Sequence, residues 1–233
     1  MRIPTYLILS AIWLFACQSE SKQSESKAET QPEQAPRALE PQTDALDEDA
    51  EWIVFFGNSL VAGYGLSQED AFPALVQRKI RDLELNYKVY NAGESGATSA
   101  DGVSRIDFLL NQVPPISVFV LELGANDGLR GIQPTETQNN LQSIIDKVKT
   151  RYPEVAILIA GMEVPPNMGD AYADEFRAVF RNLAIINQTA LIPFLLEGVA
   201  GEPELNQEDG IHPTKEGHQI VSEHVWQYLE GLL

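Results

Sequence analysis

The sequence of 233 residues contains one cysteine, Cys17, and only three histidines, all near the C-terminus. A monomer therefore cannot form a disulfide bond, and too few ligands are present for a zinc site of cysteine and histidine. Basic residues are also scarce, because 16 lysines and arginines face 34 acidic residues, for a net charge of −18. Nucleic acids require clustered positive charge, so we expect no nucleic-acid partner, and no metal site is predicted.

The N-terminus lacks an apolar run of the length that spans a membrane comfortably. Its first 17 residues have the pattern of an export signal, with Arg2 followed by an apolar run from Leu7 to Phe15. The run ends in Leu14-Phe15-Ala16-Cys17, which resembles the lipobox of bacterial lipoproteins, although Phe15 is bulkier than the usual residue. The resemblance implies lipidation of Cys17 and a lipoprotein of the bacterial cell envelope, on its periplasmic or surface face. The alternative is an ordinary secretory signal, which would give a secreted domain.

Residues 18–51 contain no aromatic residue, and ten acidic residues against three basic ones give the segment a net charge of −7. Such a composition cannot bury enough apolar surface to fold. We therefore predict a disordered acidic linker between a signal peptide, residues 1–17, and a folded domain, residues 52–233.

Within residues 52–233, apolar strand-like runs alternate with segments of helical periodicity. Five strands, each followed by a helix, predict a right-handed parallel sheet with helices on both faces, a three-layer α/β/α sandwich. Pro193 in the last strand indicates an edge position. The predicted strands are 53–56, 88–91, 118–123, 155–160 and 190–194, and the predicted helices are 71–85, 99–112, 134–151, 171–187 and a last helix that ends near residue 233.

Small polar residues follow the first three strands: Ser59, Gly93 and Asn126. A late loop adds Asp209 and His212, and in a parallel sheet such loops meet at one edge. Together they offer what acyl transfer needs: a serine nucleophile, a histidine base and an aspartate that orients the histidine. The N–H groups of Ser59 and Gly93, with the Asn126 amide, are predicted to form an oxyanion hole.

Four ordered blocks in residues 52–233 resemble those of the SGNH hydrolases, the GDSL esterase/lipase family. They are Gly57-Asn58-Ser59-Leu60, Asn91-Ala92-Gly93, Gly124-Ala125-Asn126-Asp127 and Asp209-Gly210-Ile211-His212-Pro213. The strings around the first and third blocks resemble the branch of thioesterase I, lysophospholipase L1 and arylesterase. The resemblance implies a flavodoxin-like strand order, 2-1-3-4-5, and a hydrolase of ester bonds without a cofactor. It also implies Ser59, Asp209 and His212 as the catalytic triad, and Gly93 and Asn126 in the oxyanion hole.

The usual Gly-Asp-Ser-Leu motif of that family reads Gly57-Asn58-Ser59-Leu60 in this chain. Asparagine keeps the oxygen that accepts hydrogen bonds within the turn. We therefore expect activity to survive the difference, and Asn58→Asp to change the rate by less than about tenfold.

Other groups have less specific interpretations. Met162, Val164 and Pro165 belong to an apolar loop that either packs simply or forms the wall of an acyl-chain groove. His218 and His224 are predicted to lie at the surface or the rim of the site. Glu122 is predicted to accept hydrogen bonds from loop backbone.

The sequence thus predicts an exported, lipid-anchored, monomeric serine esterase whose substrate is a small acyl ester or a lysophospholipid. A carbohydrate O-acetylesterase is the alternative among enzymes. A non-catalytic binding module on the same fold is the alternative from another class, although a binder has no need of the three triad residues together.

Overall fold

The computed structural model describes residues 49–233, apart from the side chain of Pro166. The predicted signal peptide, Cys17 and nearly all of the predicted linker lie outside these residues. The folded part begins one residue before the predicted boundary, because the first strand starts at Glu51.

Five parallel strands form one sheet in the order β2-β1-β3-β4-β5. This confirms the predicted fold class and strand order, and it confirms the edge position of the proline-containing region. The strands are β1 (Glu51–Gly57), β2 (Tyr87–Gly93), β3 (Ile116–Glu122), β4 (Ala156–Ala160) and β5 (Ala190–Ile192).

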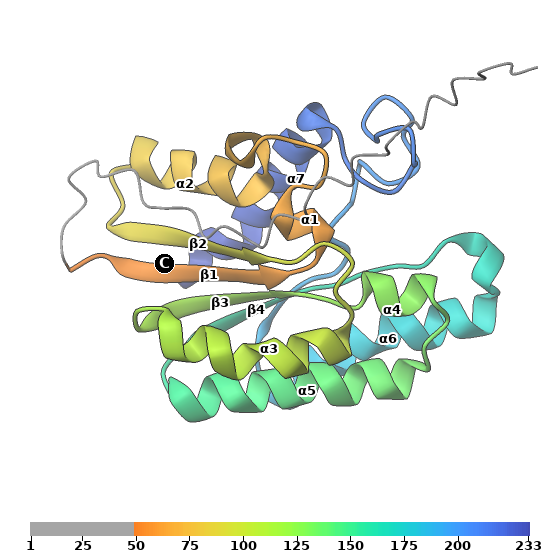
Figure 1. Cartoon of the computed structure of the whole chain (residues 1–233), viewed down its shortest axis with the longest axis horizontal. Helices are drawn as coiled ribbons and strands as arrows, with labels where there is room; N and C mark the ends of the chain where they lie inside the picture. The colour runs from red at the N-terminus through yellow and green to blue at the C-terminus, as the bar shows by residue number, and fades with distance from the viewer. Residues whose placement is uncertain (1–48) are drawn as a thin grey trace, which may run out of the picture. The chain divides into compact units, whose positions relative to one another are not determined.

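Helices cover both faces of the sheet, as Figure 1 shows. One face carries α2 (Phe72–Asp82) and α7 (Lys215–Leu229), and the other carries α3 (Ser99–Gln112), α5 (Pro134–Arg151) and α6 (Asp170–Asn187). Two short helices, α1 (Ser59–Ala62) and α4 (Ala125–Leu129), follow β1 and β3. Single 3₁₀ turns lie at Gln68–Asp70, Pro166–Met168 and Glu230–Leu232.

Most predicted boundaries agree with the structure to within one or two residues. Two helix ends differ more, because α7 ends at Leu229 rather than near residue 233, and α2 ends at Asp82 rather than at residue 85. Glu84, just after α2, has a φ of 54°. A left-handed backbone cannot continue an α-helix. The last strand stops at Ile192, one residue before Pro193, which has no N–H to donate to a sheet.

The core lies between the sheet and its two helical layers. Residues Ile53 to Phe56 of β1 are completely buried, and so are the inward residues of α5, including Leu141 and Ile144. Burial on both faces explains why β1 contains four consecutive apolar residues rather than an alternating pattern.

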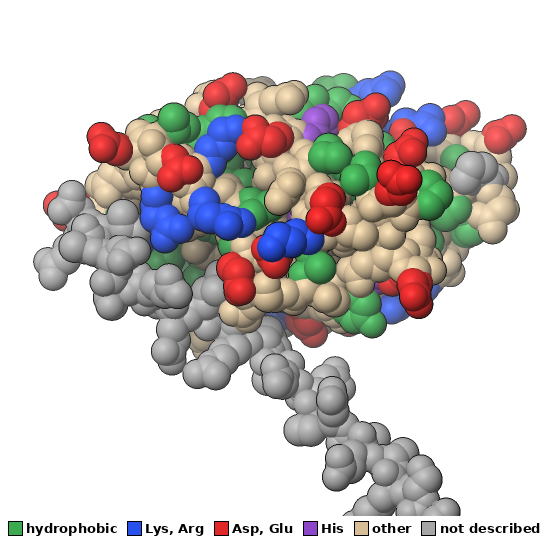
Figure 2. Space-filling view, turned by 90° about the horizontal axis from the view of Figure 1, so that it is seen from above, with side chains coloured by type: hydrophobic (Ala, Val, Ile, Leu, Met, Phe, Trp, Pro, Cys, Tyr) green, Lys and Arg blue, Asp and Glu red, His purple; other side chains and the backbone are tan. Residues whose placement is uncertain are grey.

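Seen from the side of α2 and α7, the described surface mixes charges of both signs (Figure 2). Acidic side chains are spread between apolar and polar ones, while lysines and arginines gather over one part of this face. None of the helices within residues 49–233 combines the length and apolarity needed to cross a membrane.

The strand register brings three loops together. Gly57 at the end of β1 pairs with Gly93 of β2 on one side and with Glu122 of β3 on the other. The segments that follow these three residues therefore start at the same edge of the sheet, where α/β folds bind their ligands.

Candidate active site

Ser59 lies on a sharp turn between β1 and α1. Asn58 caps α1, because its side-chain Oδ1 accepts a hydrogen bond from the Leu60 N–H at 2.9 Å. This confirms the predicted role of the Asn58 oxygen in the turn. Ser59 is the first residue of the helix and is largely buried.

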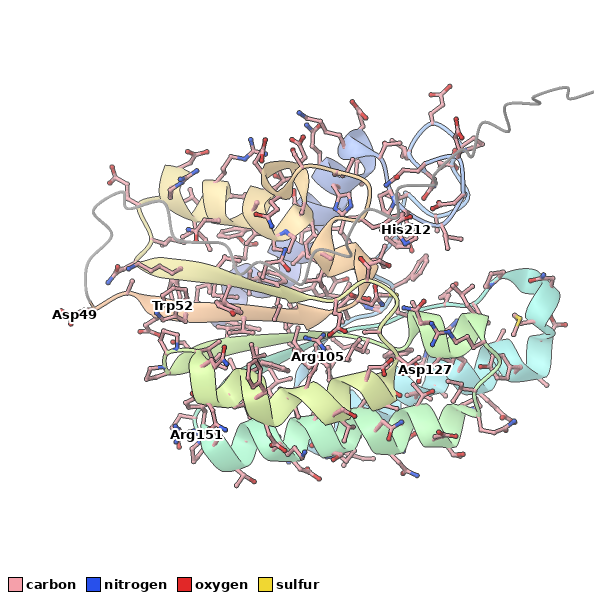
Figure 3. All side chains as sticks on the ribbon, viewed as in Figure 1. Asp49, Trp52, Arg105, Asp127, Arg151 and His212 are labelled. Atoms are coloured by element: carbon pink, nitrogen blue, oxygen red, sulfur yellow. The ribbon has the colours of Figure 1, made fainter. Side chains whose placement is uncertain are left out.

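His212 reaches Ser59 from a loop 153 residues later in the chain. Its Nε2 lies 2.9 Å from Ser59 Oγ, and its Nδ1 lies 2.6 Å from Asp209 Oδ2. The structure thus brings the three predicted triad residues into one hydrogen-bonded chain. In Figure 3 His212 lies toward the edge at which the strands end.

The turn around Asp209 holds its carboxylate in place. The other carboxylate oxygen, Oδ1, accepts the N–H groups of Ile211 and His212 at 3.0 and 3.1 Å. The hydrogen bond from the His212 side chain, followed by that from the Ile211 backbone, lowers the pKa of Asp209 to about 2. Asp209 is therefore ionised at neutral pH and can orient the imidazole.

The geometry does not support Gly93 as an oxyanion donor. Its N–H already donates to Asn91 Oδ1 at 2.9 Å, and a Cβ at this position would lie 2.2 Å from the Ala62 nitrogen. Gly93 is thus a packing residue, which lets β2 approach α1 closely. The sequence pattern could not separate this steric role from a role in binding, because both require glycine.

Gly96 in the loop after β2 is a better candidate donor. Its φ is +83°, open space surrounds it, and its N–H makes no hydrogen bond to another described residue. The loop is held from two sides, because the Glu94 N–H donates to Gly57 O at 3.0 Å and the Asn126 amide donates to Ala97 O at 2.9 Å. Gly96 therefore belongs to a loop that contacts both the Ser59 turn and Asn126. A second glycine beyond the strand end was the available sequence signal.

Asn126 lies in α4, directly after β3. One hydrogen of its amide is used by Ala97, so the other is available to a ligand. The Ser59 N–H, at the first position of α1, likewise has no intrahelical acceptor. Ser59, Gly96 and Asn126 are thus the candidate donors of an oxyanion hole.

The chain is similar to known hydrolases over most of its length. Residues 55–220 match the GDSL-like lipase/acylhydrolase family. The chain belongs to this family. It is 40% identical over 184 residues to esterase TesA of Pseudomonas aeruginosa, in a match that covers 79% of this chain and 90% of the relative. It is 37% identical to thioesterase 1/protease 1/lysophospholipase L1 of Escherichia coli, over 79% of this chain and 86% of the relative. A crystal structure of TesA superposes with a TM-score of 0.75 at 38% identity, over 78% of this chain and all of that one.

The asparagine that replaces the family's usual aspartate has a second role, which the sequence did not reveal. Asn58 Nδ2 donates to Glu122 Oε1 at 2.9 Å, and the Asn58 N–H donates to Glu122 Oε2 at 2.9 Å. The second bond confirms that Glu122 accepts from loop backbone. Glu122 is completely buried, and this burial raises its pKa to about 8, against the opposing effect of the Asn58 hydrogen bonds and the Arg105 charge.

The predicted substrate-binding residues divide into two groups. Met162 is only 2% exposed and belongs to the core, so its side chain does not form part of an open groove wall in this structure. Val164 and Pro165 are partly exposed. Val164 packs on α4, because a Cβ at Gly128 would lie 2.5 Å from its Cγ1.

Three other apolar side chains lie exposed on elements of the site. Tyr64, Leu129 and Ile211 are 50%, 42% and 44% exposed. The Tyr64 ring packs on the His212 ring with centroids 4.5 Å apart, Leu129 belongs to the helix of Asn126, and Ile211 precedes His212. They leave apolar surface exposed on the segments that carry Ser59, Asn126 and His212.

The prediction that His218 lies at the surface or rim is wrong. His218 is 1% exposed, and its Nδ1 accepts the Phe72 N–H at 3.1 Å, which joins α7 to the start of α2. Burial, together with the nearby His212, lowers the pKa of His218 to about 4. His224 bonds the Phe194 carbonyl at 3.0 Å. Within residues 49–233 no group of three His, Cys, Asp or Glu side chains is placed to hold a metal ion.

Proposed function

We propose that this chain is a serine esterase that hydrolyses carboxylic ester bonds through an acyl-enzyme. The observation that carries the proposal is the Asp209–His212–Ser59 chain, with links of 2.6 and 2.9 Å. Such a chain makes a serine hydroxyl nucleophilic and serves no evident purpose in a binding module. The esterase and lysophospholipase names of the relatives support the same reaction class.

In the proposed first step, Ser59 Oγ attacks the ester carbonyl carbon while His212 Nε2 takes the hydroxyl proton. The oxyanion receives hydrogen bonds from the Ser59 and Gly96 N–H groups and the Asn126 amide. The intermediate collapses, and His212 gives its proton to the departing alcohol, which leaves an acyl group on Ser59. Water then attacks this acyl group with His212 as base, and the carboxylic acid is released.

Lysophospholipids and other acyl esters are the proposed substrates. The exposed Tyr64, Leu129 and Ile211 side chains offer an apolar surface beside the serine, which suits an acyl chain. A sugar acetate has no such chain and would leave this surface unused.

Hydrolysis of p-nitrophenyl esters from acetate to palmitate, measured beside Ser59→Ala and His212→Ala, tests the proposal. We expect each variant to lose roughly 10⁴- to 10⁶-fold in kcat. An optimum at medium or long chains supports the lipid-ester assignment, and an optimum at acetate favours the O-acetylesterase. A folded protein without activity on any ester would contradict the enzyme proposal and favour a binding module.

We also propose that the protein is a monomeric lipoprotein of the cell envelope, anchored through Cys17. The support is the lipobox-like segment that ends at Cys17, together with the acidic, Pro- and Ser-containing segment that follows it. Labelling with a radioactive fatty acid should mark the wild type and not Cys17→Ser, and the variant should leave the membrane fraction. An unlabelled wild type would indicate the ordinary secretory signal instead.

A further inference from the structure

The peptide group that joins Gly57 to Asn58, just ahead of Ser59, lies between the Arg105 guanidinium and the Glu122 carboxyl group. The Gly57 carbonyl accepts from Arg105 Nη2 at 2.7 Å, and the N–H of the same peptide, on Asn58, donates to Glu122 Oε2 at 2.9 Å. The guanidinium thus faces the negative end of the peptide dipole, and a carboxyl oxygen of Glu122 faces its positive end. Both contacts strengthen in a buried environment.

Arg105 belongs to α3 and lies between that helix and the sheet (Figure 3), and it reaches this peptide from there. It also donates to Ala92 O at 2.8 Å, so one guanidinium group joins the ends of β1 and β2. Its guanidinium lies 3.8 Å above the Phe56 ring, which limits its freedom to move. The geometry of the turn therefore depends on a side chain that touches neither Ser59 nor His212.

Glu122 comes from the end of β3, on the opposite side of the peptide. A Cβ at Gly57 would lie 2.4 Å from Glu122 Oε2, so only glycine lets the carboxyl group reach the peptide N–H. This explains the glycine of the turn by a named contact rather than by backbone freedom, since Gly57 has no positive φ.

The Asn58 side chain completes the arrangement, and it uses both of its functional groups. Its amide donates to Glu122 Oε1 at 2.9 Å, while its oxygen accepts the Leu60 N–H at 2.9 Å. An aspartate could make the second bond but has no hydrogen for the first. Two carboxyl groups in these positions would have to share a proton, because two groups this close cannot both be ionised without a large cost in free energy.

The other charged groups near Glu122 and Arg105 lie in α3 and in the loop after β2. Arg105 from α3 favours the ionised form of Glu122, as do the N–H groups of Asn58 and Val61. Burial lowers the pKa of Arg105, and the carboxylates of Glu94, after β2, and Asp101, in α3, oppose this shift. Glu94 Oε2 lies 3.3 Å from Arg105 Nε. Burial of the carboxyl group opposes the effects that favour its ionised form.

We propose that Glu122 and Arg105 are positioning residues that hold the Gly57–Asn58 peptide and thereby fix the Ser59 hydroxyl and N–H. We call the Arg105, Glu122 and Asn58 side chains the clamp. Because residue 58 is asparagine and not the usual aspartate, its amide donates to Glu122, and the two side chains need not share a proton. The proposal rests on the nucleophilic role proposed for Ser59. It assigns to the buried Glu122 a function in the reaction that does not require contact with the substrate.

An exchange of hydrogen-bonding partners tests the proposal, with variants Glu122→Gln, Asn58→Asp and the double variant Asn58→Asp/Glu122→Gln. In Glu122→Gln, two donors of Asn58 face a side chain with one oxygen and one NH₂ group. One donor is then left opposed by another donor, so we expect kcat to fall by about tenfold or more. In the double variant the introduced glutamine donates to the introduced aspartate and accepts the backbone N–H. Both bonds between residues 58 and 122 are restored, and kcat should return to within about threefold of the wild type.

The pH dependence separates positioning from general stability. Asn58→Asp should retain nearly full kcat where the two carboxyl groups share a proton, and should lose about tenfold or more above roughly pH 9, where they cannot. The double variant, which has one carboxyl group at this place, should not show that loss. KM should change little in all three proteins, because the clamp acts on the nucleophile.

Glu223→Gln, an exposed glutamate on α7 paired with Lys79, is the matched control and should leave kcat unchanged. A double variant no more active than the weaker single variant would overturn the proposal, as would wild-type kcat in folded Glu122→Gln. If Glu122→Gln does not fold, a folded and active double variant supports the clamp, and a double variant that also fails to fold or work refutes it. Ser59→Ala is assayed alongside, because activity in that variant refutes the nucleophilic role whatever the clamp does.

Discussion

Replacement of His218 by asparagine should change how the stability of the protein depends on pH. His218 is buried against Phe72 and has a pKa of about 4, against an ordinary value of 6.5. Between these values the unfolded chain binds a proton that the folded protein does not bind, so the free energy of unfolding decreases as the pH falls through this range. Asparagine is chosen because its side-chain oxygen can still accept the Phe72 N–H, while the titrating group is removed.

The size of the effect follows from the two pKa values. A difference of about 2.5 units corresponds to about 3 kcal/mol of unfolding free energy lost from the wild type between about pH 7.5 and pH 4. Other groups also titrate in this range. Burial of Glu122, which raises its pKa to about 8, acts in the opposite direction, but it is the same in both proteins and cancels in their difference.

Urea denaturation of both proteins at several pH values measures this difference. The stability advantage of the wild type over His218→Asn should shrink, or its deficit grow, by about 3 kcal/mol between about pH 7.5 and pH 4. A difference that stays constant within about 0.5 kcal/mol would show that His218 is not held neutral in the folded state, and would refute the reasoning.

The remaining predictions concern the site. Asp209 keeps its charge down to about pH 2, because its pKa in the folded protein lies below its ordinary value. Asp209→Asn should therefore reduce kcat by roughly 10³- to 10⁴-fold at every pH from about 5 to 9. A loss confined to acidic pH would contradict this prediction. Asn126→Ala should lower kcat by roughly 100- to 1000-fold with only a small fall in melting temperature from the lost bond to Ala97. Gly93→Ala should lower the melting temperature more, because its Cβ would meet α1. Tyr64→Ala should reduce kcat by about threefold to tenfold and Tyr64→Phe should restore it, because the ring packs on His212; equal effects of both variants would assign the role to the hydroxyl instead.

The fold could be predicted from the sequence because its signals are local. Continuous apolar runs such as 53–56 indicate strands buried on both faces, and the helical periodicity of 134–151 gives a helix with the same bounds in the structure. The strand order came from the resemblance to the family rather than from the pattern, since apolar runs do not specify their neighbours.

The candidate site could be predicted only in part. Ser59, Asp209 and His212 could be named, because the chemistry of acyl transfer restricts which residue types can serve and the family blocks mark their positions. The sequence pattern named Gly93 as the donor after β2, whereas the geometry favours Gly96, because a glycine required for packing and a glycine open to a ligand look alike in a sequence. The burial of His218 was missed, because helical periodicity does not reveal which polar residues of α7 face α2.

The sequence by itself determined the α/β class, the order of the segments and the types of residue available for chemistry, since these follow from local periodicity and composition. Only the tertiary structure decided that Glu122 and Arg105 meet on the peptide before Ser59, and that Asn58 serves as a donor as well as a cap. The physical reason is that these bonds join residues up to 64 positions apart, and their strength depends on burial by three different elements. No local pattern encodes such a contact, because each partner alone reads as an ordinary strand end or helix side chain.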